Sequence, residues 1–167
     1  MAQVFDVETC LLEIKKRLYD ATYGLNAQLT AIDAEKATTD AADYSKTITL
    51  KQLNGSAVFL LTASQYASNY DPFIAITIED YMTDELGGVL FKTGIRLTIL
   101  DTADGVADIR ALRYLRALRQ CFEITRWTNG LKYQRIKQLE TAGYIDTADN
   151  RSWREIGISL ETSFAAY

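Results

Sequence analysis

The 167-residue sequence predicts a single α+β domain, in which a long N-terminal helix and a second helix pack on one face of a mostly antiparallel β-sheet. Two observations predict this class. Apolar residues recur with helical spacing near the start of the chain and again over residues 106–126, whereas most other segments alternate apolar and polar residues as strands do. The strands follow one another through turns, which favours antiparallel pairing. No linker or repeat divides the sequence, so we expect one domain over residues 1–167.

The N-terminal helix is predicted over residues 6–37, because apolar side chains recur at steps of three and four from Val7 to Ile32. Gly24 lies inside this run and could divide the helix into two. Residues 38–43 are rich in Thr, Asp and Ala, and we expect them to form a loop.

A β-hairpin is predicted over residues 44–61, as a possible insertion in the domain. Its central residues Asn54 and Gly55 form a two-residue turn signal, because both tolerate the positive φ angles that such turns need. The only proline, Pro72, then precedes a strand over residues 73–80, a position that tolerates a missing N–H group.

An acidic turn over residues 81–88 leads to the strand with the clearest alternation, residues 89–100. The second helix, residues 106–126, has an apolar arc that includes Tyr114 and Leu118, with four arginines on the opposite half. Strands over residues 132–145 and 153–164 complete the predicted fold.

The composition excludes several kinds of chemistry. The chain contains no histidine, which removes histidine-based catalytic triads and histidine metal ligands. Cys10 and Cys121 lie inside predicted helices and are expected to be buried hydrophobic residues rather than a disulfide. The formal charge of −4 argues against a general nucleic-acid binder. No apolar run is long enough for a membrane span and the N-terminus does not resemble a signal peptide, so we expect synthesis in a cytoplasm without membrane association.

A metal site is the main enzymatic alternative. Glu79, Asp80, Asp84 and Glu85 are oxygen ligands that could gather Mg²⁺, which would suit a carboxylate-based metal-dependent hydrolase. Their spacing matches no known Ca²⁺ loop, and acidic residues are common in hairpin turns. The favoured prediction is therefore a protein with no catalytic residues, no metal and no cofactor.

The candidate interface residues lie on the second helix and in the acidic turn. A net basic half of the helix could bind an acidic surface or phosphates, because a guanidinium pairs with such groups through two hydrogen bonds, although a solvated face is the alternative. Residues 1–105 carry a formal charge of −7 and residues 106–167 one of +3, which could attract copies of the chain head to tail. The candidate partner-binding residues are Arg110, Arg113, Arg116, Arg119, Tyr81, Asp84 and Glu85.

The order of elements resembles that of the tail terminator and neck (head–tail joining) proteins of tailed bacteriophages. The resemblance rests on the apolar stripe from Val7 to Ile32, the segment DPFIAI at residues 71–76, the long strand at residues 90–100, the helix ADIRALRYLRALRQCFE at residues 107–123, and the hairpin that ends at Tyr167. It covers most of the chain, and the predicted hairpin at residues 44–61 has no clear place in it.

The resemblance implies a structural protein of the virion tail or neck, assembled in the bacterial host cytoplasm. Such proteins form a ring, usually a hexamer, which ends polymerisation of the tail tube and joins the tail to the neck or connector. The partners it implies are further copies of the chain, the tail tube protein and a neck or connector protein. Viral DNA would pass through the channel without sequence-specific binding, which suits an acidic protein. Another neck or head-completion protein is the nearest alternative.

Overall fold

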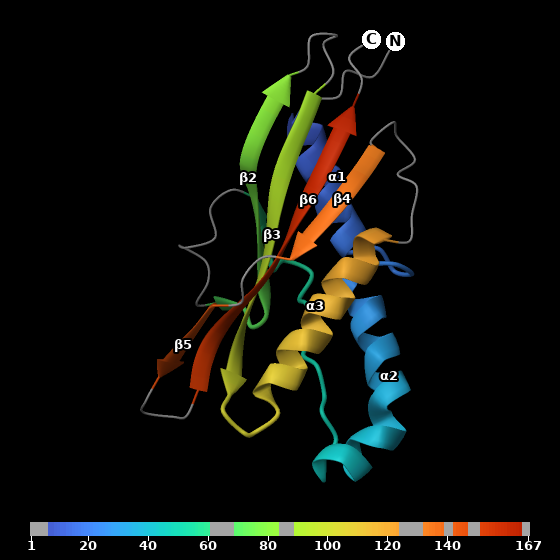
Figure 1. Cartoon of the computed structure of the whole chain (residues 1–167), viewed down its shortest axis with the longest axis vertical. Coiled ribbons are helices and arrows are strands. Elements are labelled where there is room, and N and C mark those ends of the chain that lie inside the picture. Colours follow the sequence, from blue (N-terminus) through green and yellow to red (C-terminus); the bar gives the residue numbers. More distant parts are fainter. Residues whose placement is uncertain are drawn as a thin grey trace.

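The computed structural model describes residues 7–60, 69–83, 89–123, 132–138, 142–146 and 151–164. These residues form three helices and a six-stranded sheet, so the predicted α+β class is confirmed (Figure 1). The helices are α1 (Val7–Leu18), α2 (Leu25–Tyr44) and α3 (Ala107–Glu123). The strands are β1 (Val58–Leu60), β2 (Phe73–Thr83), β3 (Val89–Thr102), β4 (Lys132–Gln138), β5 (Ala142–Asp146) and β6 (Arg151–Phe164).

The sheet has the strand order β1-β2-β3-β6-β4, and β5 also pairs with β6. Every pair is antiparallel except β1 with β2, so the predicted mostly antiparallel sheet is confirmed. The two 14-residue strands β3 and β6 pair along their whole length at the centre. The sheet twists strongly, and β5 lies at the end opposite β4 (Figure 1).

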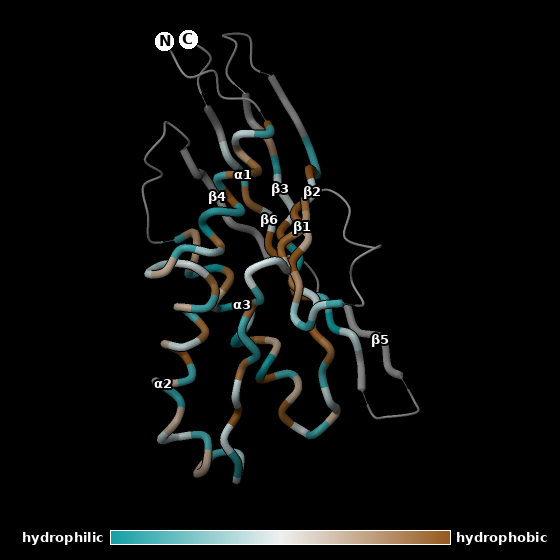
Figure 2. Tube along the Cα trace, turned by 180° about the vertical axis from the view of Figure 1, so that it is seen from behind, coloured by the Kyte–Doolittle hydropathy of each residue, from teal (hydrophilic) through white to brown (hydrophobic). Residues whose placement is uncertain are grey.

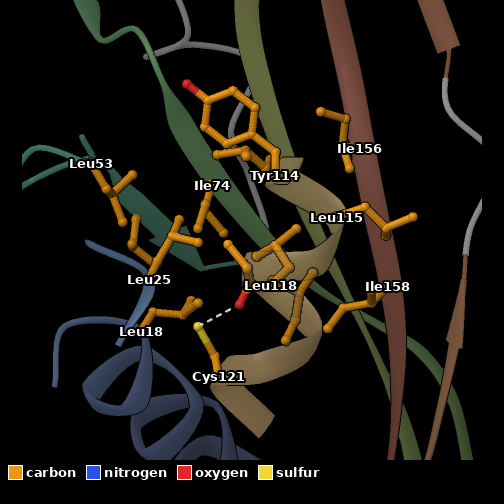
Figure 3. Packing of buried hydrophobic residues seen from close by; sticks show 14 of the residues in the cluster. Leu18, Leu25, Leu53, Ile74, Tyr114, Leu115, Leu118, Cys121, Ile156 and Ile158 are labelled. Atoms are coloured by element: carbon orange, nitrogen blue, oxygen red, sulfur yellow. Dashed lines mark hydrogen bonds between the residues drawn. The ribbon is translucent and has the colours of Figure 1, made fainter. Parts of the chain in front are cut away.

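The hydrophobic core lies between the helices and one face of the sheet. That face carries alternate residues of β2, β3 and β6, and the register aligns them in rows such as Ile76, Ile95 and Ile158. The hydrophobic stretches gather at the middle of the molecule, where β1, β2 and β3 lie together (Figure 2). Side chains of α3 pack between the sheet and the α1–α2 junction (Figure 3). The alternation predicted for β3 and β6 and the apolar arc predicted for α3 are confirmed by burial.

The N-terminal helix is divided in two before α2, as the position of Gly24 indicated, and is not continuous over residues 6–37. The division lies at residues 19–24, where the Asp20 carboxylate accepts hydrogen bonds from the backbone N–H groups of Thr22 and Tyr23. At Gly24 a Cβ atom would lie 2.3 Å from the carbonyl oxygen of Asp20, so a larger residue could not occupy this junction without a backbone shift. The predicted loop at residues 38–43 is wrong, because α2 continues to Tyr44.

The predicted hairpin at residues 44–61 is replaced by an irregular segment that runs along α2. Three backbone N–H groups of this segment donate to side chains of α2 rather than to a neighbouring strand: Ile48 to Asp40 at 3.1 Å, Leu50 to Asp33 at 3.2 Å and Leu53 to Asn26 at 2.6 Å. The three acceptors are spaced seven residues apart and therefore lie on one stripe of the helix. Because these side chains satisfy the backbone donors, the segment is extended without being part of the sheet.

The remaining elements differ from the prediction in detail. β1 pairs parallel with β2, and β2 extends to Thr83. β4 and β5 lie within the region of the strand predicted over residues 132–145, of which residues 139–141 lie outside the described ranges. The predicted strand start after Pro72 is confirmed. Cys10 and Cys121 are buried and do not form a disulfide, as predicted.

Candidate functional site

The first candidate surface is the half of α3 that carries four arginines. One of them, Arg113, is buried. The two terminal nitrogens of Arg113 donate to the two carboxylate oxygens of Asp40 at 2.9 and 2.5 Å. Only 7% of the Arg113 side chain and 2% of the Asp40 side chain are exposed. The prediction that Arg113 faces a partner is therefore wrong, because α2 covers this part of α3 and supplies the carboxylate.

Arg110 closes the loop between β3 and α3. Its guanidinium donates to Asp101 at 2.7 Å, to both oxygens of Asp104, and to the carbonyl oxygen of Thr102 at 2.8 Å. Its side chain is 14% exposed. Because its donors are directed at neighbouring residues of its own chain, Arg110 stabilises this loop, and its role at a partner surface stays a prediction.

Arg116 and Arg119 are the two predicted arginines that remain at the surface. Arg116 forms a two-point ion pair with Glu35 of α2 at 3.0 and 2.6 Å, and Arg119 pairs with Glu123 one turn along α3. Both side chains are more than 40% exposed, so each can exchange its present acid for another. Exposed pairs of this kind contribute about 0–1 kcal/mol each.

Acids of residues 1–105 and arginines of α3 largely pair with one another inside the molecule. Acids of α2 and of the loop before α3 face the arginines of α3, in pairs that join residues far apart in sequence, such as Asp40–Arg113 and Glu35–Arg116. A helical wheel places these arginines on the polar half of α3, but it cannot show that an acidic helix packs there. The predicted net basic docking face is thus largely neutralised by the fold.

The acidic turn is only partly described. Tyr81 lies in β2 rather than in the turn, whereas Asp84 and Glu85 lie outside the described residues. Of the other two candidate metal ligands, Glu79 lies 3.7 Å from a terminal nitrogen of Arg96, and Asp80 lies 3.6 Å from Nζ of Lys92. Within the described ranges, no three His, Cys, Asp or Glu side chains are grouped so that they could hold a metal ion.

The second candidate surface is the face of the sheet opposite the core, which we call the open face. No helix of the described residues packs on it. Its charged side chains form ion pairs across the strands: Arg96 with Glu79 and Glu155, and Lys92 with Asp80 and Glu161. On β2, β3 and β6, four carboxylates therefore surround the two cations Lys92 and Arg96. The strand alternation predicted which residues lie here, but sequence reasoning did not single them out as a surface.

Three strands of the open face are joined at Glu79. Its carboxylate accepts a hydrogen bond of 2.9 Å from the hydroxyl of Ser159 on β6, although β3 lies between the two strands. The carboxylate passes over Gly94 of β3, where a Cβ atom would lie 2.5 Å from Oε1. Glycine at this position therefore leaves the space that the Glu79 side chain occupies. The hydrogen bond between Glu79 and Ser159 therefore connects β2 with β6 across β3 on the open face.

The Cys121 thiol and the Tyr114 hydroxyl are buried and stay protonated at neutral pH. Burial raises the pKa of the Cys121 thiol to about 12, so the thiol stays protonated at neutral pH. Its sulfur donates to the carbonyl oxygen of Ala117 at 3.2 Å (Figure 3). Burial also raises the pKa of Tyr114, whose hydroxyl accepts a hydrogen bond from the backbone N–H of Lys51.

Comparison with known proteins supplies no family for this chain. No family model matches it, and no curated protein matches it. Of the helices in the described ranges, none has the length and the hydrophobicity that a membrane span needs.

The buried ion pair predicts a loss of stability in acid. Hydrogen bonds from Arg113 hold the pKa of Asp40 below its usual value, and Arg110 does the same for Asp104. A carboxyl with a lowered folded-state pKa stabilises the fold above the unfolded value of about 4, and this stabilisation is lost as the pH falls through the folded-state pKa. Asp33 acts in the opposite sense, because burial raises its pKa. We expect urea midpoints to fall steadily below about pH 4.

The Asp40→Asn variant isolates this contribution. It should be less stable than the wild type at neutral pH, and the two stability curves should converge as the pH falls, because the wild-type carboxylate is then protonated. Curves that stay parallel down to the lowest accessible pH would show that Asp40 does not carry the acid dependence.

Proposed function

We propose that this protein is a structural virion protein of a tailed bacteriophage that assembles into a ring at the head-proximal end of the tail. The ring ends polymerisation of the tail tube and joins the tail to the neck or connector. Its partners are further copies of the chain, in a ring of six, together with the tube protein and a neck protein. Viral DNA passes through the channel without sequence-specific binding. In this proposal the chain acts as a scaffold and not as an enzyme, and its place is the virion after assembly in the host cytoplasm.

The observation that carries this proposal is the open face of the sheet. On β2, β3 and β6 this face is broad and polar, and Lys92 and Arg96 each lie beside two carboxylates of their own chain. A protein that grips DNA needs free cations that can release the counterions of the phosphates. Lys92 and Arg96 are instead paired with carboxylates of the same chain, which suits the wall of a channel that DNA must pass.

The fold also supports the proposal. The strand after Pro72, the long strand β3, helix α3 and the hairpin of β5 and β6 follow one another in the order on which the resemblance to tail terminator and neck proteins rests. The irregular segment along α2 replaces the hairpin that had no clear place in that resemblance.

Particle size and tube length test the proposal. Sedimentation velocity of the purified protein at micromolar concentration should show a ring, alone or after addition of tail tubes. Electron micrographs should show caps at one end of each tube, and tubes polymerising in its presence should stop growing. Tube protein polymerised alone is the control and should keep elongating. A protein that stays monomeric in both conditions, and leaves tube length unchanged, would overturn the proposal.

A further inference from the structure

The Asn54–Gly55 pair forms a turn that does not join two strands. The backbone N–H of Ala57 donates to the carbonyl oxygen of Asn54 at 3.0 Å, so residues 54–57 form a β-turn, and Asn54, Gly55 and Ser56 are exposed. Neither Asn54 nor Gly55 adopts the positive φ angle that favours this pair in hairpins. A Cβ atom at Gly55 would meet no atom within 4 Å. Neither space nor backbone conformation therefore requires glycine here.

The side chain of Asn54 folds back over this turn. Its Oδ1 atom accepts a hydrogen bond of 3.0 Å from the backbone N–H of Ser56, which makes an Asx turn. In an Asx turn the side-chain amide carbon lies beside the main-chain nitrogen of the next residue, here Gly55. No hydrogen bond of the described residues uses the Gly55 N–H. The amide carbon of Asn54 therefore lies beside a nitrogen that no acceptor holds in place.

This arrangement favours loss of the side-chain amide. The Gly55 nitrogen gives its proton to hydroxide and attacks Cγ of Asn54, so that an N–C bond forms and negative charge develops on Oδ1. The Ser56 N–H already donates to that oxygen and stabilises the charge. The bond from Cγ to Nδ2 then breaks, and Nδ2 takes a proton from water and leaves as ammonia. Water opens the resulting cyclic succinimide at either carbonyl, which gives aspartate or isoaspartate at position 54.

We propose that Asn54 of the folded chain is a deamidation site, and that its isoaspartate product loosens the turn between the irregular segment along α2 and β1. The reaction needs only the chain and water, and no atom changes its oxidation state. The site is a modification site at the surface, and it is independent of the proposed function.

Both ends of the turn are anchored, which gives the modification its effect. On one side Asn26 of α2 binds Leu53 through hydrogen bonds of 2.8 Å to its carbonyl oxygen and 2.6 Å from its N–H. On the other side the carbonyl oxygen of Ala57 accepts from the backbone N–H of Ile74 at 2.8 Å. Isoaspartate adds a carbon atom to the main chain between these anchors, and the carbonyl that closes the turn becomes a free carboxylate. Aspartate adds charge alone.

Peptide mass spectrometry of the native protein after incubation at mildly alkaline pH tests the site. Asn54 should convert to the acid, while Asn26, whose side-chain oxygen and nitrogen both bind Leu53, should keep its amide. The same incubation in urea is the control, and Asn54 should react at least as fast in the folded chain as in the unfolded chain. Slower reaction in the folded chain, or none, would overturn the proposal. Fragment ions distinguish Asn54 from the pair at residues 129–130, which lies outside the described residues.

The Gly55→Ala variant separates the chemistry from the fold. Its Cβ atom meets open space, so circular dichroism should show the wild-type fold. It should deamidate on the order of tenfold more slowly, because the Cβ atom crowds the attacking nitrogen and restricts the backbone. Ser56→Ala is the matched control, since it keeps the backbone N–H donor, and it should react at the wild-type rate. A folded Gly55→Ala variant that reacts as fast as the wild type would contradict attack by this nitrogen.

The effect on the turn is measured on the separated products. Anion-exchange chromatography separates the reacted chains by their additional negative charge. The isoaspartate form should have a lower urea midpoint than the wild type and faster amide exchange at Ala57, whose N–H closes the turn. The Asn54→Asp variant carries the same charge on an unchanged main chain and should keep a midpoint close to that of the wild type. An isoaspartate form as stable as the wild type, or an equal loss in Asn54→Asp, would overturn the loosening by the added atom.

Discussion

The Arg113→Ala variant is expected to lose about 3–5 kcal/mol of unfolding free energy, because it leaves the Asp40 carboxylate buried without its cation. The wild-type pair is almost wholly removed from water, and Asp40 also accepts a hydrogen bond from the backbone N–H of Ile48. Truncation of Arg113 therefore removes two charge-assisted hydrogen bonds and a compensating charge at once. Urea denaturation followed by circular dichroism measures the loss.

Arg116→Ala is the matched control, because Arg116 lies one turn further along α3 and also forms a two-point ion pair. Its pair with Glu35 is exposed, so we expect a loss of about 0–1 kcal/mol. Equal losses in the two variants would contradict the conclusion that burial, rather than the ion pair itself, determines the effect. A small loss for Arg113→Ala would restore this residue as a candidate for the partner-facing surface.

The Leu118→Ala variant is expected to lose about 2–5 kcal/mol, through lost hydrophobic burial and the cavity that remains. Leu118 is fully buried on the side of α3 that faces the sheet, where Ile74 of β2 and Ile158 of β6 belong to the same cluster (Figure 3). Strands on either side hold these residues in register, so the site has little freedom to collapse around a smaller side chain. The urea midpoint should fall while the slope of the transition stays unchanged.

Leu112→Ala gives the corresponding control on the same helix. Leu112 is 58% exposed, and surface substitutions of this kind usually change stability by about 0.5 kcal/mol or less. A loss at Leu112 comparable with that at Leu118 would contradict the conclusion that burial against the sheet determines the effect, because alanine has the higher helix propensity of the two residues.

Much of the fold could be predicted from local pattern. The alternation in β3 and β6 identified the buried face of the sheet, because successive strand residues point to opposite sides. The spacing of Tyr114, Leu118 and Cys121 identified the buried side of α3, because helix geometry brings these positions to one face. These predictions succeeded because the information lies in residues close together in sequence.

The failed predictions involve residues that are far apart in sequence. The segment at residues 48–53 has the composition of a strand, yet its donors reach Asn26, Asp33 and Asp40 on α2, and only the fold brings these groups together. The same holds for the candidate interface. From the sequence, Arg113 is predicted to be an exposed cation. In the fold, α2 packs against α3 and Asp40 pairs with Arg113.

By itself, the sequence determined the fold class, the faces of the long strands, the buried side of α3 and the absence of histidine chemistry, because these follow from composition and from the repeat of helix and strand. Only the tertiary structure decided which charges are free, because a charge is neutralised by whatever acid or base the fold places beside it. Three arginines of α3 meet acids that lie outside this helix, and only the packing of α2 against α3 brings Asp40 and Glu35 to two of them.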